Sequence, residues 1–148
     1  MAKDKKEVQI GIKSIKEICF SQVQIEDTSI SDSDLQFSFG FSLNLNKDAQ
    51  TMDVIVGVRY LYKGNVVLEC QYSIIFHIVG FDQVVSICDD NKNFKASDDF
   101  IATLLGVGFG TLRGIVVVKT AGTLLNNHPI PIVNPSKIAQ SVTKQAPK

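Results

Sequence analysis

Large apolar residues and small or polar residues alternate without a break from Leu35 to Asn46. Side chains of a β-strand point alternately to its two faces, so this segment is predicted to be a strand with one face on a core. Two more strands, rich in Val and Ile, are predicted at residues 52–62 and 66–79. Residues 63–65, Lys-Gly-Asn, have the composition of a tight hairpin turn, so these two strands are expected to be antiparallel neighbours.

A further strand is predicted before these three, at residues 8–25. Val8, Ile10 and Ile12 alternate with small or polar residues, and Ile15 then shifts the register, which indicates an irregularity near Ser14. The polar residues 26–34 are predicted to form a loop.

A long helix is predicted to begin after Ser97, because Ser is a favoured N-cap residue and two acids follow in the first turn. It is expected to run to Ala121, with Gly122 as its left-handed stop. The alternative is a glycine-rich loop over residues 106–114 followed by a strand, because β-branched residues lower helix propensity. With the helix, the chain is of α+β class, an antiparallel sheet backed by one long helix.

Two stretches carry apolar residues without a clear period. Residues 80–96 connect the last strand to the helix, and residues 124–133 form an extended segment held by alternating prolines. Residues 134–136, Asn-Pro-Ser, are able to cap a short final helix. We therefore expect a single domain at residues 7–138, with flexible termini at 1–6 and 139–148.

Composition excludes several function classes. Lys+Arg and Asp+Glu number 15 each, which gives no electrostatic attraction to nucleic acid or to an anionic membrane. The three cysteines have neither disulfide-framework nor zinc-site spacing, so reduced thiols, a cytoplasmic location and no metal site are expected. Residues 100–118 are long and apolar enough to span a membrane, but four glycines and Arg113 favour a buried core helix, with no membrane insertion.

No catalytic constellation is visible in the sequence. His77 is expected to be structural and His128, which precedes a proline, to be solvated. The acid pairs at residues 89–90 and 98–99 fall in a predicted loop and a predicted helix cap. We therefore expect no enzyme activity and no cofactor.

The chain resembles the SecB family of holding chaperones. The resemblance is carried by residues 15–20 (IKEICF), by residues 69–82 (ECQYSIIFHIVGFD) with the long helix after them, by Gly122-Thr123 and by residues 129–135 (PIPIVNP). It implies a four-stranded antiparallel sheet, a long helix against it and a shorter C-terminal helix. It also implies an ATP-independent chaperone that binds unfolded polypeptides in apolar grooves and assembles as a homotetramer, a dimer of dimers.

The resemblance places the client-binding residues in the two apolar stretches; core packing under a long loop is the alternative for each. They are Phe81, Val84, Val85, Ile87, Phe94, Leu125, Ile130, Ile132 and Val133. Small residues one turn apart on the long helix indicate a backbone packed closely against the sheet or a second helix. The resemblance, in which long helices pack at the centre of the assembly, makes them the predicted oligomer interface: Ala102, Gly106, Gly110 and Gly114.

Two departures from SecB proper argue against docking to the translocase motor, although a role in protein export fits the family. The chain is neutral where SecB is acidic, and the outer face of its clearest strand carries Gln, Ser and Asn. An interaction module dedicated to one partner, such as an antitoxin, is therefore the alternative function.

Overall fold

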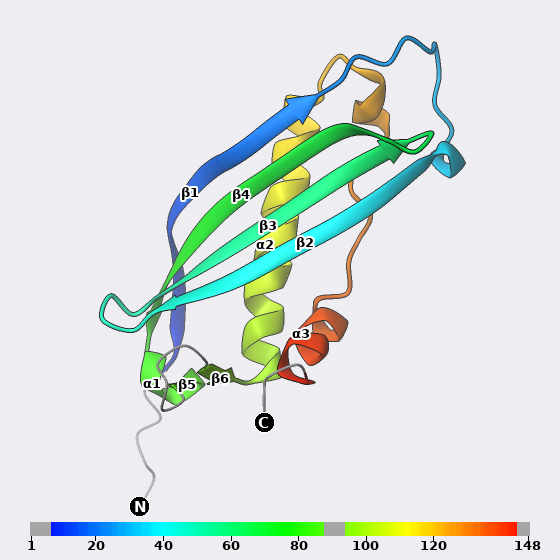
Figure 1. The fold of residues 1–148 in the computed structure, drawn as a ribbon. Coiled ribbons are helices and arrows are strands. Elements are labelled where there is room, and N and C mark those ends of the chain that lie inside the picture. The colour runs from blue at the N-terminus through cyan, green and yellow to red at the C-terminus, as the bar shows by residue number, and fades with distance from the viewer. Residues whose placement is uncertain (1–6, 88–93, 145–148) are drawn as a thin grey trace, which may run out of the picture.

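The computed structural model describes residues 7–87 and 94–144. Four long strands form one antiparallel sheet in the spatial order β1-β4-β3-β2, so the first strand joins the outside of a three-stranded meander (Figure 1). Its strands are β1 (Gln9–Gln22), β2 (Leu35–Asn46), β3 (Thr51–Tyr62) and β4 (Asn65–Val79).

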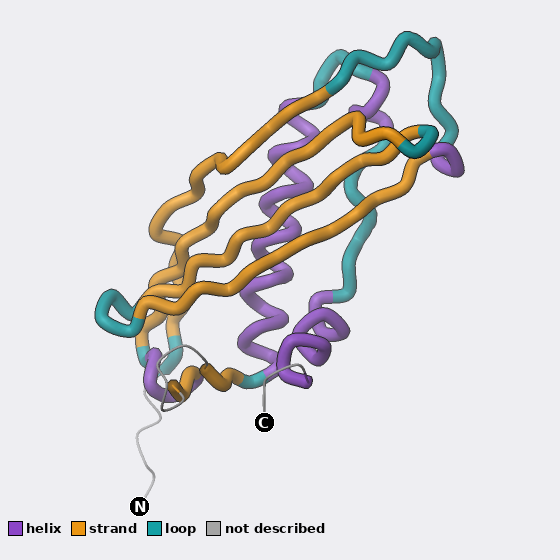
Figure 2. The backbone as a smooth tube through the Cα atoms, viewed as in Figure 1, coloured by secondary structure: helices purple, strands orange, loops and turns teal. Residues whose placement is uncertain are grey.

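A single long helix crosses one face of the sheet, and the other elements are short (Figure 2). Together they give the expected α+β fold, with one long helix on a four-stranded sheet and a short C-terminal helix. The remaining elements are η1 (Asp32–Asp34), α1 (Phe81–Val84), β5 (Val85–Ile87), β6 (Phe94–Ala96), α2 (Asp98–Lys119), η2 (Leu124–Asn127) and α3 (Pro135–Lys144).

The two edge strands differ in regularity. Strand β2 pairs with β3 from Leu35 to Asn46 without a shift. Strand β1 shifts its pairing with β4 twice, between Ile12 and Ser14 as predicted and again between Glu17 and Cys19. Each shift bends the strand locally, so β1 follows the twist of the sheet less regularly than β2 does.

The predicted long helix is confirmed, and the alternative of a loop and a strand is excluded. The Ser97 hydroxyl accepts a hydrogen bond from the Phe100 amide at 3.2 Å and caps the first turn of α2. The helix ends at Lys119, and Gly122 has a φ of 83°, a value that glycine adopts without strain. By length and composition alone α2 could cross a membrane, but in the structure it buries eight of its 22 residues.

Glycine at position 108 lets α2 approach the sheet closely. A Cβ at Gly108 would lie 3.1 Å from Cγ1 of Val56 and 3.6 Å from Cγ1 of Val54. Both valines are fully buried on β3, and the aromatic side chains of Tyr60 on β3 and Phe76 on β4 are buried in the same core. The backbone of α2 therefore rests directly on the middle of the sheet.

One helix is narrower than the sheet that it covers. A helix is about 10–12 Å wide, and four strands about 4.8 Å apart need roughly twice that width of cover. Helix α2 packs on the two central strands, β3 and β4. The helix-side faces of both edge strands are consequently exposed in part, at Ile12 and Ile15 on β1 and at Phe39 on β2.

The C-terminal segment covers the β2 side of α2. Arg113 on α2 donates hydrogen bonds to the carbonyls of Ile130 and Pro131, at 2.9 and 3.3 Å, and holds the extended segment 128–134 alongside the helix (Figure 1). Helix α3 then packs on α2 and buries Ala139 fully. Helix α3 thus continues to Lys144, into the terminus that was predicted to be flexible from residue 139; residues 1–6 and 145–148 lie outside the described part of the chain.

We expect Gly108→Ala to be less stable than Gly110→Ala by about 1–3 kcal/mol, the usual cost of overpacking a core. The added methyl group at position 108 meets Val56, whereas nothing lies within 4 Å of a Cβ at Gly110. Because alanine favours helix by up to about 1 kcal/mol over glycine, Gly110→Ala should match or exceed the wild type. Urea unfolding followed by circular dichroism measures both, and equal stability of the two variants would contradict the close approach.

Candidate functional site

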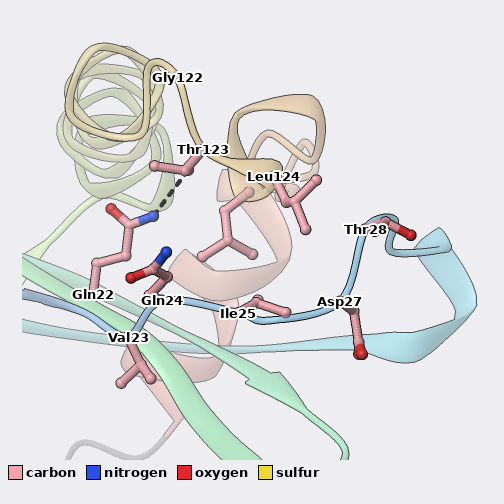
Figure 3. Close-up of a pocket in the computed structure, with 10 residues that line it drawn as sticks. Gln22, Val23, Gln24, Ile25, Asp27, Thr28, Gly122, Thr123 and Leu124 are labelled. Carbon is pink, nitrogen blue, oxygen red and sulfur yellow. Dashed lines mark hydrogen bonds between the residues drawn. The ribbon is translucent and has the colours of Figure 1, made fainter.

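An open cleft lies where β1 leaves the sheet and faces the turn after α2 (Figure 3). Its volume is about 560 Å³, and its two walls are the segments 22–28 and 122–125. The apolar part of the lining comes from Val23, Ile25, Leu124 and Leu125. The cleft is open to solvent, and Asp27 is the single ionisable residue in its lining. The other lining residues are Gln22, Gln24, Thr28, Gly122 and Thr123.

Hydrogen bonds fix the two walls at the inner end of the cleft. The Gln22 amide donates to the Thr123 hydroxyl at 2.9 Å, and that hydroxyl donates to the Thr120 carbonyl at 2.8 Å (Figure 3). The Val23 amide donates to the Val67 carbonyl at 2.8 Å, which extends the β1–β4 ladder by one bond. The cleft is therefore preformed at this end.

A charged network lies just below the cleft, between β1 and the end of α2. Glu17 accepts a hydrogen bond from the Tyr72 hydroxyl at 2.9 Å and pairs with Lys119 at 2.7 Å. The Lys119 ammonium also lies 4.7 Å from the centre of the Phe20 ring. The hydrogen bond from Lys119 and then that from Tyr72 hold the pKa of Glu17 below its ordinary value.

Two aspartates tie the outer wall of the cleft to the rest of the molecule. Asp27 accepts hydrogen bonds from the Tyr62 hydroxyl and, at 3.5 Å, from the Lys63 ammonium. The pKa of Asp27 lies below its ordinary value, mainly because of the hydrogen bond from the Tyr62 hydroxyl and next because of the charge of Lys63. Asp32 in η1 pairs with Nδ1 of His128.

His128 is not solvated as predicted from the sequence. Its side chain is 11% exposed, and its carbonyl accepts a hydrogen bond from the Tyr60 hydroxyl at 2.8 Å. The proline that follows His128 in the sequence could not indicate this, because the carboxylate that pairs with His128 belongs to Asp32, 96 residues away in the chain. His77, by contrast, is exposed on the sheet face away from α2.

The predicted client-binding residues do not gather in one place. Those of segment 80–96 lie around α1, β5 and β6, whereas segment 124–133 begins at η2, near the other end of α2, and runs back along α2 toward α3 (Figure 1). Their burial differs as well. Phe81, Val85, Leu125 and Ile130 are buried, Val84, Ile87, Phe94 and Val133 are half-buried, and Ile132 is 90% exposed.

Of these nine residues, Leu125 alone lines the cleft of Figure 3. Val23, Ile25 and Leu124 also line the cleft and were not predicted from the sequence. A signal was present for Ile25, an isolated large apolar residue at the start of a polar loop. Val23 is 56% exposed, but in the sequence it continues the apolar pattern of the first strand, so it was read as a strand residue.

The predicted glycine interface on α2 is divided between two environments. Gly106 faces α3, where its Cβ would lie 3.5 Å from Cγ of Pro135, and Ala102 packs against the core. Gly110 and Gly114 are exposed, with nothing within 4 Å of a Cβ. They share an uncharged face of the helix with the exposed Val107 and Val117, so this half of the stripe is open to a partner.

Catalytic chemistry finds little support in the described residues. They contain no group of three or more His, Cys, Asp or Glu side chains that could hold a metal ion. Burial is the main cause that raises the pKa of the Cys70 thiol to about 11, which leaves it protonated and unreactive near neutral pH. Burial likewise raises the pKa of Tyr60 to about 12.

The fold is similar to that of the SecB-like chaperone Rv1957 of Mycobacterium tuberculosis, solved in complex with a ChAD peptide from the Rv1956 HigA1 antitoxin. The TM-score is 0.52 at 10% sequence identity, and the similarity covers 84% of this chain and 86% of that one. No protein-family model and no curated protein matches the sequence. The expected SecB-like fold is therefore confirmed, at a level of identity that establishes the fold alone.

The Glu17 network should make stability depend on pH. Because folding lowers the Glu17 pKa, the network stabilises the protein above the ordinary carboxyl range and loses this contribution as the pH falls below about 4. Glu17→Gln should therefore lower the urea midpoint at pH 7, and the difference from wild type should shrink at pH 3. Glu26→Gln, at an exposed site without a hydrogen bond or ion pair in the structure, is the control. An equal difference in urea midpoint between Glu17→Gln and wild type at pH 7 and pH 3 would refute this link between Glu17 ionisation and stability.

Proposed function

We propose that this protein is an ATP-independent chaperone that binds non-native polypeptide segments through the cleft and the neighbouring apolar segment 128–134. The observation that carries the proposal is the open, partly apolar cleft formed by Val23, Ile25, Leu124 and Leu125. The SecB-like fold and the peptide bound by Rv1957 support it.

The cleft suits an extended chain because it offers two kinds of contact. Its apolar residues bury client side chains, and each fully buried Val, Leu or Phe side chain contributes roughly 1.5–3 kcal/mol. The amide of Gln24 and the hydroxyl of Thr28 can hydrogen-bond to the backbone of a client that lacks secondary structure. Neither kind of contact requires a particular client sequence.

Ile132 extends this apolar surface beyond the cleft. It is exposed for 90% of its surface, although it directly follows two residues whose carbonyls Arg113 holds against α2. Pro131, the residue before it, has a fixed φ, so the chain that leads to Ile132 is stiff. A fixed and exposed isoleucine loses little entropy on meeting a client, so it is suited to binding.

A dedicated partner is the second candidate function. It is favoured by the antitoxin peptide in the structure of Rv1957. Protein export receives less support, because the outer sheet face offers few free acids: Glu69 pairs with Arg59 at 3.2 Å, and Asp53 accepts a hydrogen bond from Ser73 at 2.6 Å. The unpaired thiols of Cys19 and Cys70 agree with the proposed cytoplasmic location.

The proposal includes self-association through the exposed face of α2 into a homo-oligomer, a dimer of dimers. Val107, Gly110, Gly114 and Val117 form an uncharged stripe there. The apolar helix-side surface of β1 lies beside α2 and adds Ile10, Ile12 and Ile15, each more than a third exposed. An apolar surface of this extent is typical of an interface.

Suppression of aggregation tests the chaperone proposal. The protein, without nucleotide, should suppress the aggregation of several unrelated unfolded proteins near stoichiometric ratios. Ile132→Ser should weaken client binding roughly tenfold, the equivalent of about 1.4 kcal/mol. Val79→Ser, which removes an exposed valine from the sheet face away from α2, should leave it unchanged. Failure with every client would refute a general chaperone and leave the dedicated-partner function.

The α2 interface predicts the solution mass. The wild type should be larger than a monomer by light scattering, and Val107→Glu should dissociate it because it places a charge in the apolar stripe. Ser42→Glu adds the same charge to the outer face of β2 and should leave the mass unchanged. A monomeric wild type would exclude this interface.

A further inference from the structure

We infer that residues 23–34, the loop between β1 and β2, form a latched lid over part of the client-binding surface. The inference rests on the proposed function for its biological meaning, and on the geometry of the loop for its existence. The lid is also the outer wall of the cleft, and the bond from Val23 to Val67 holds its base to the sheet. In the closed position the cleft is narrow, and opening of the lid widens it toward Leu125 without removing its inner end.

The lid has two apolar anchors in an otherwise polar segment. Ile25 and Ile30 are half-buried and pack against the core, whereas most of the other residues between Val23 and Asp34 are exposed. Isolated isoleucines that turn inward hold a loop down by burial alone. An apolar client side chain can replace such contacts at nearly equal free energy.

Side chains, rather than backbone bonds, hold the lid. Among the described residues, no backbone hydrogen bond joins residues 24–30 to another element. The attachment comes from Asp27, bound to Tyr62 and Lys63 at the end of β3, and from Asp32, bound to His128. These latch carboxylates are 47% and 93% exposed, so water competes for them and the latches are weak enough to open.

The surface beneath the lid carries two of the predicted client-binding residues. Leu125 and Ile130 are almost fully buried, and His128 lies between them in the chain. The pairing of His128 with Asp32 places the second half of the lid beside this segment, while Ile25 and Leu125 line the same cleft. Opening of the lid would expose Leu125 at the cleft and release His128 in the segment that leads to Ile130, which reconciles the burial of Leu125 with a role in binding.

The test compares Asp27→Ala/Asp32→Ala, which removes both latches, with Glu26→Ala. Glu26 is an exposed acid of the same loop, for which the structure shows no hydrogen bond or ion pair. Hydrogen exchange of residues 24–34 is measured first, without a client. The probe is then reduced and carboxymethylated lactalbumin, a permanently unfolded polypeptide, with affinity measured by fluorescence anisotropy.

Loss of both latches should raise hydrogen exchange in the loop about tenfold and lower the dissociation constant of the probe about threefold or more, because a larger fraction of the molecules is open. Glu26→Ala should change neither quantity. Tyr62→Phe, which removes one hydrogen bond and keeps the ring, should shift both in the same direction by a smaller factor. This variant provides the test if the double variant fails to fold.

Unchanged exchange in the latch variants would overturn the lid, whatever the probe does. Weaker probe binding in all the acid variants, Glu26→Ala included, would also overturn it, because the loop acids would then contact the client directly. Faster exchange with no probe binding by any variant, wild type included, would uphold the lid and refute the proposed chaperone function, so the two failures are distinguishable.

Discussion

The structure depends on one packing constraint, which is that a single helix must cover a four-stranded sheet. Gly108 brings the backbone of α2 against Val56, so the helix packs closely on the two central strands. The helix is only about half as wide as the sheet, so it covers neither edge strand fully. It meets β2 at the Phe39–Phe109 ring contact and β1 at the Glu17–Lys119 ion pair. The other elements on the helix side of the sheet cover part of the apolar surface that α2 leaves exposed.

The two edge strands of the sheet are covered to different extents. On the β2 side the chain returns along α2, held there by Arg113, and α3 completes the cover. On the β1 side the described chain supplies little beyond the network of Glu17, Tyr72 and Lys119, which lies at one end of the strand. Ile10, Ile12 and Ile15 therefore face solvent in the single chain, and a second copy is the simplest source of the missing cover.

The sequence predicted the elements well because their signals are local. The alternation after Leu35 and the cap at Ser97 are each contained in a few residues, and both were confirmed. The roles of the glycines were harder to predict: α3 of the same chain covers Gly106, whereas Gly110 and Gly114 stay exposed, and the close contact with the sheet is made by Gly108, which lies outside the predicted stripe. The cleft was missed because its walls are about 100 residues apart in the chain, and no local pattern shows that folding brings them together.

The region around His128 shows how incomplete cover can serve binding. A fully covered core would need an apolar loop between β1 and β2, but residues 26–34 contain a single large apolar residue, Ile30, among acids, serines and threonine. Such a loop cannot pack firmly, so it depends on exposed carboxylates such as Asp27 and Asp32 for its position. A chaperone of the proposed kind needs apolar surface that is hidden from its own copies yet accessible to a client. A lightly anchored loop with weak polar attachment would satisfy both needs, because its opening would disturb neither the sheet nor α2.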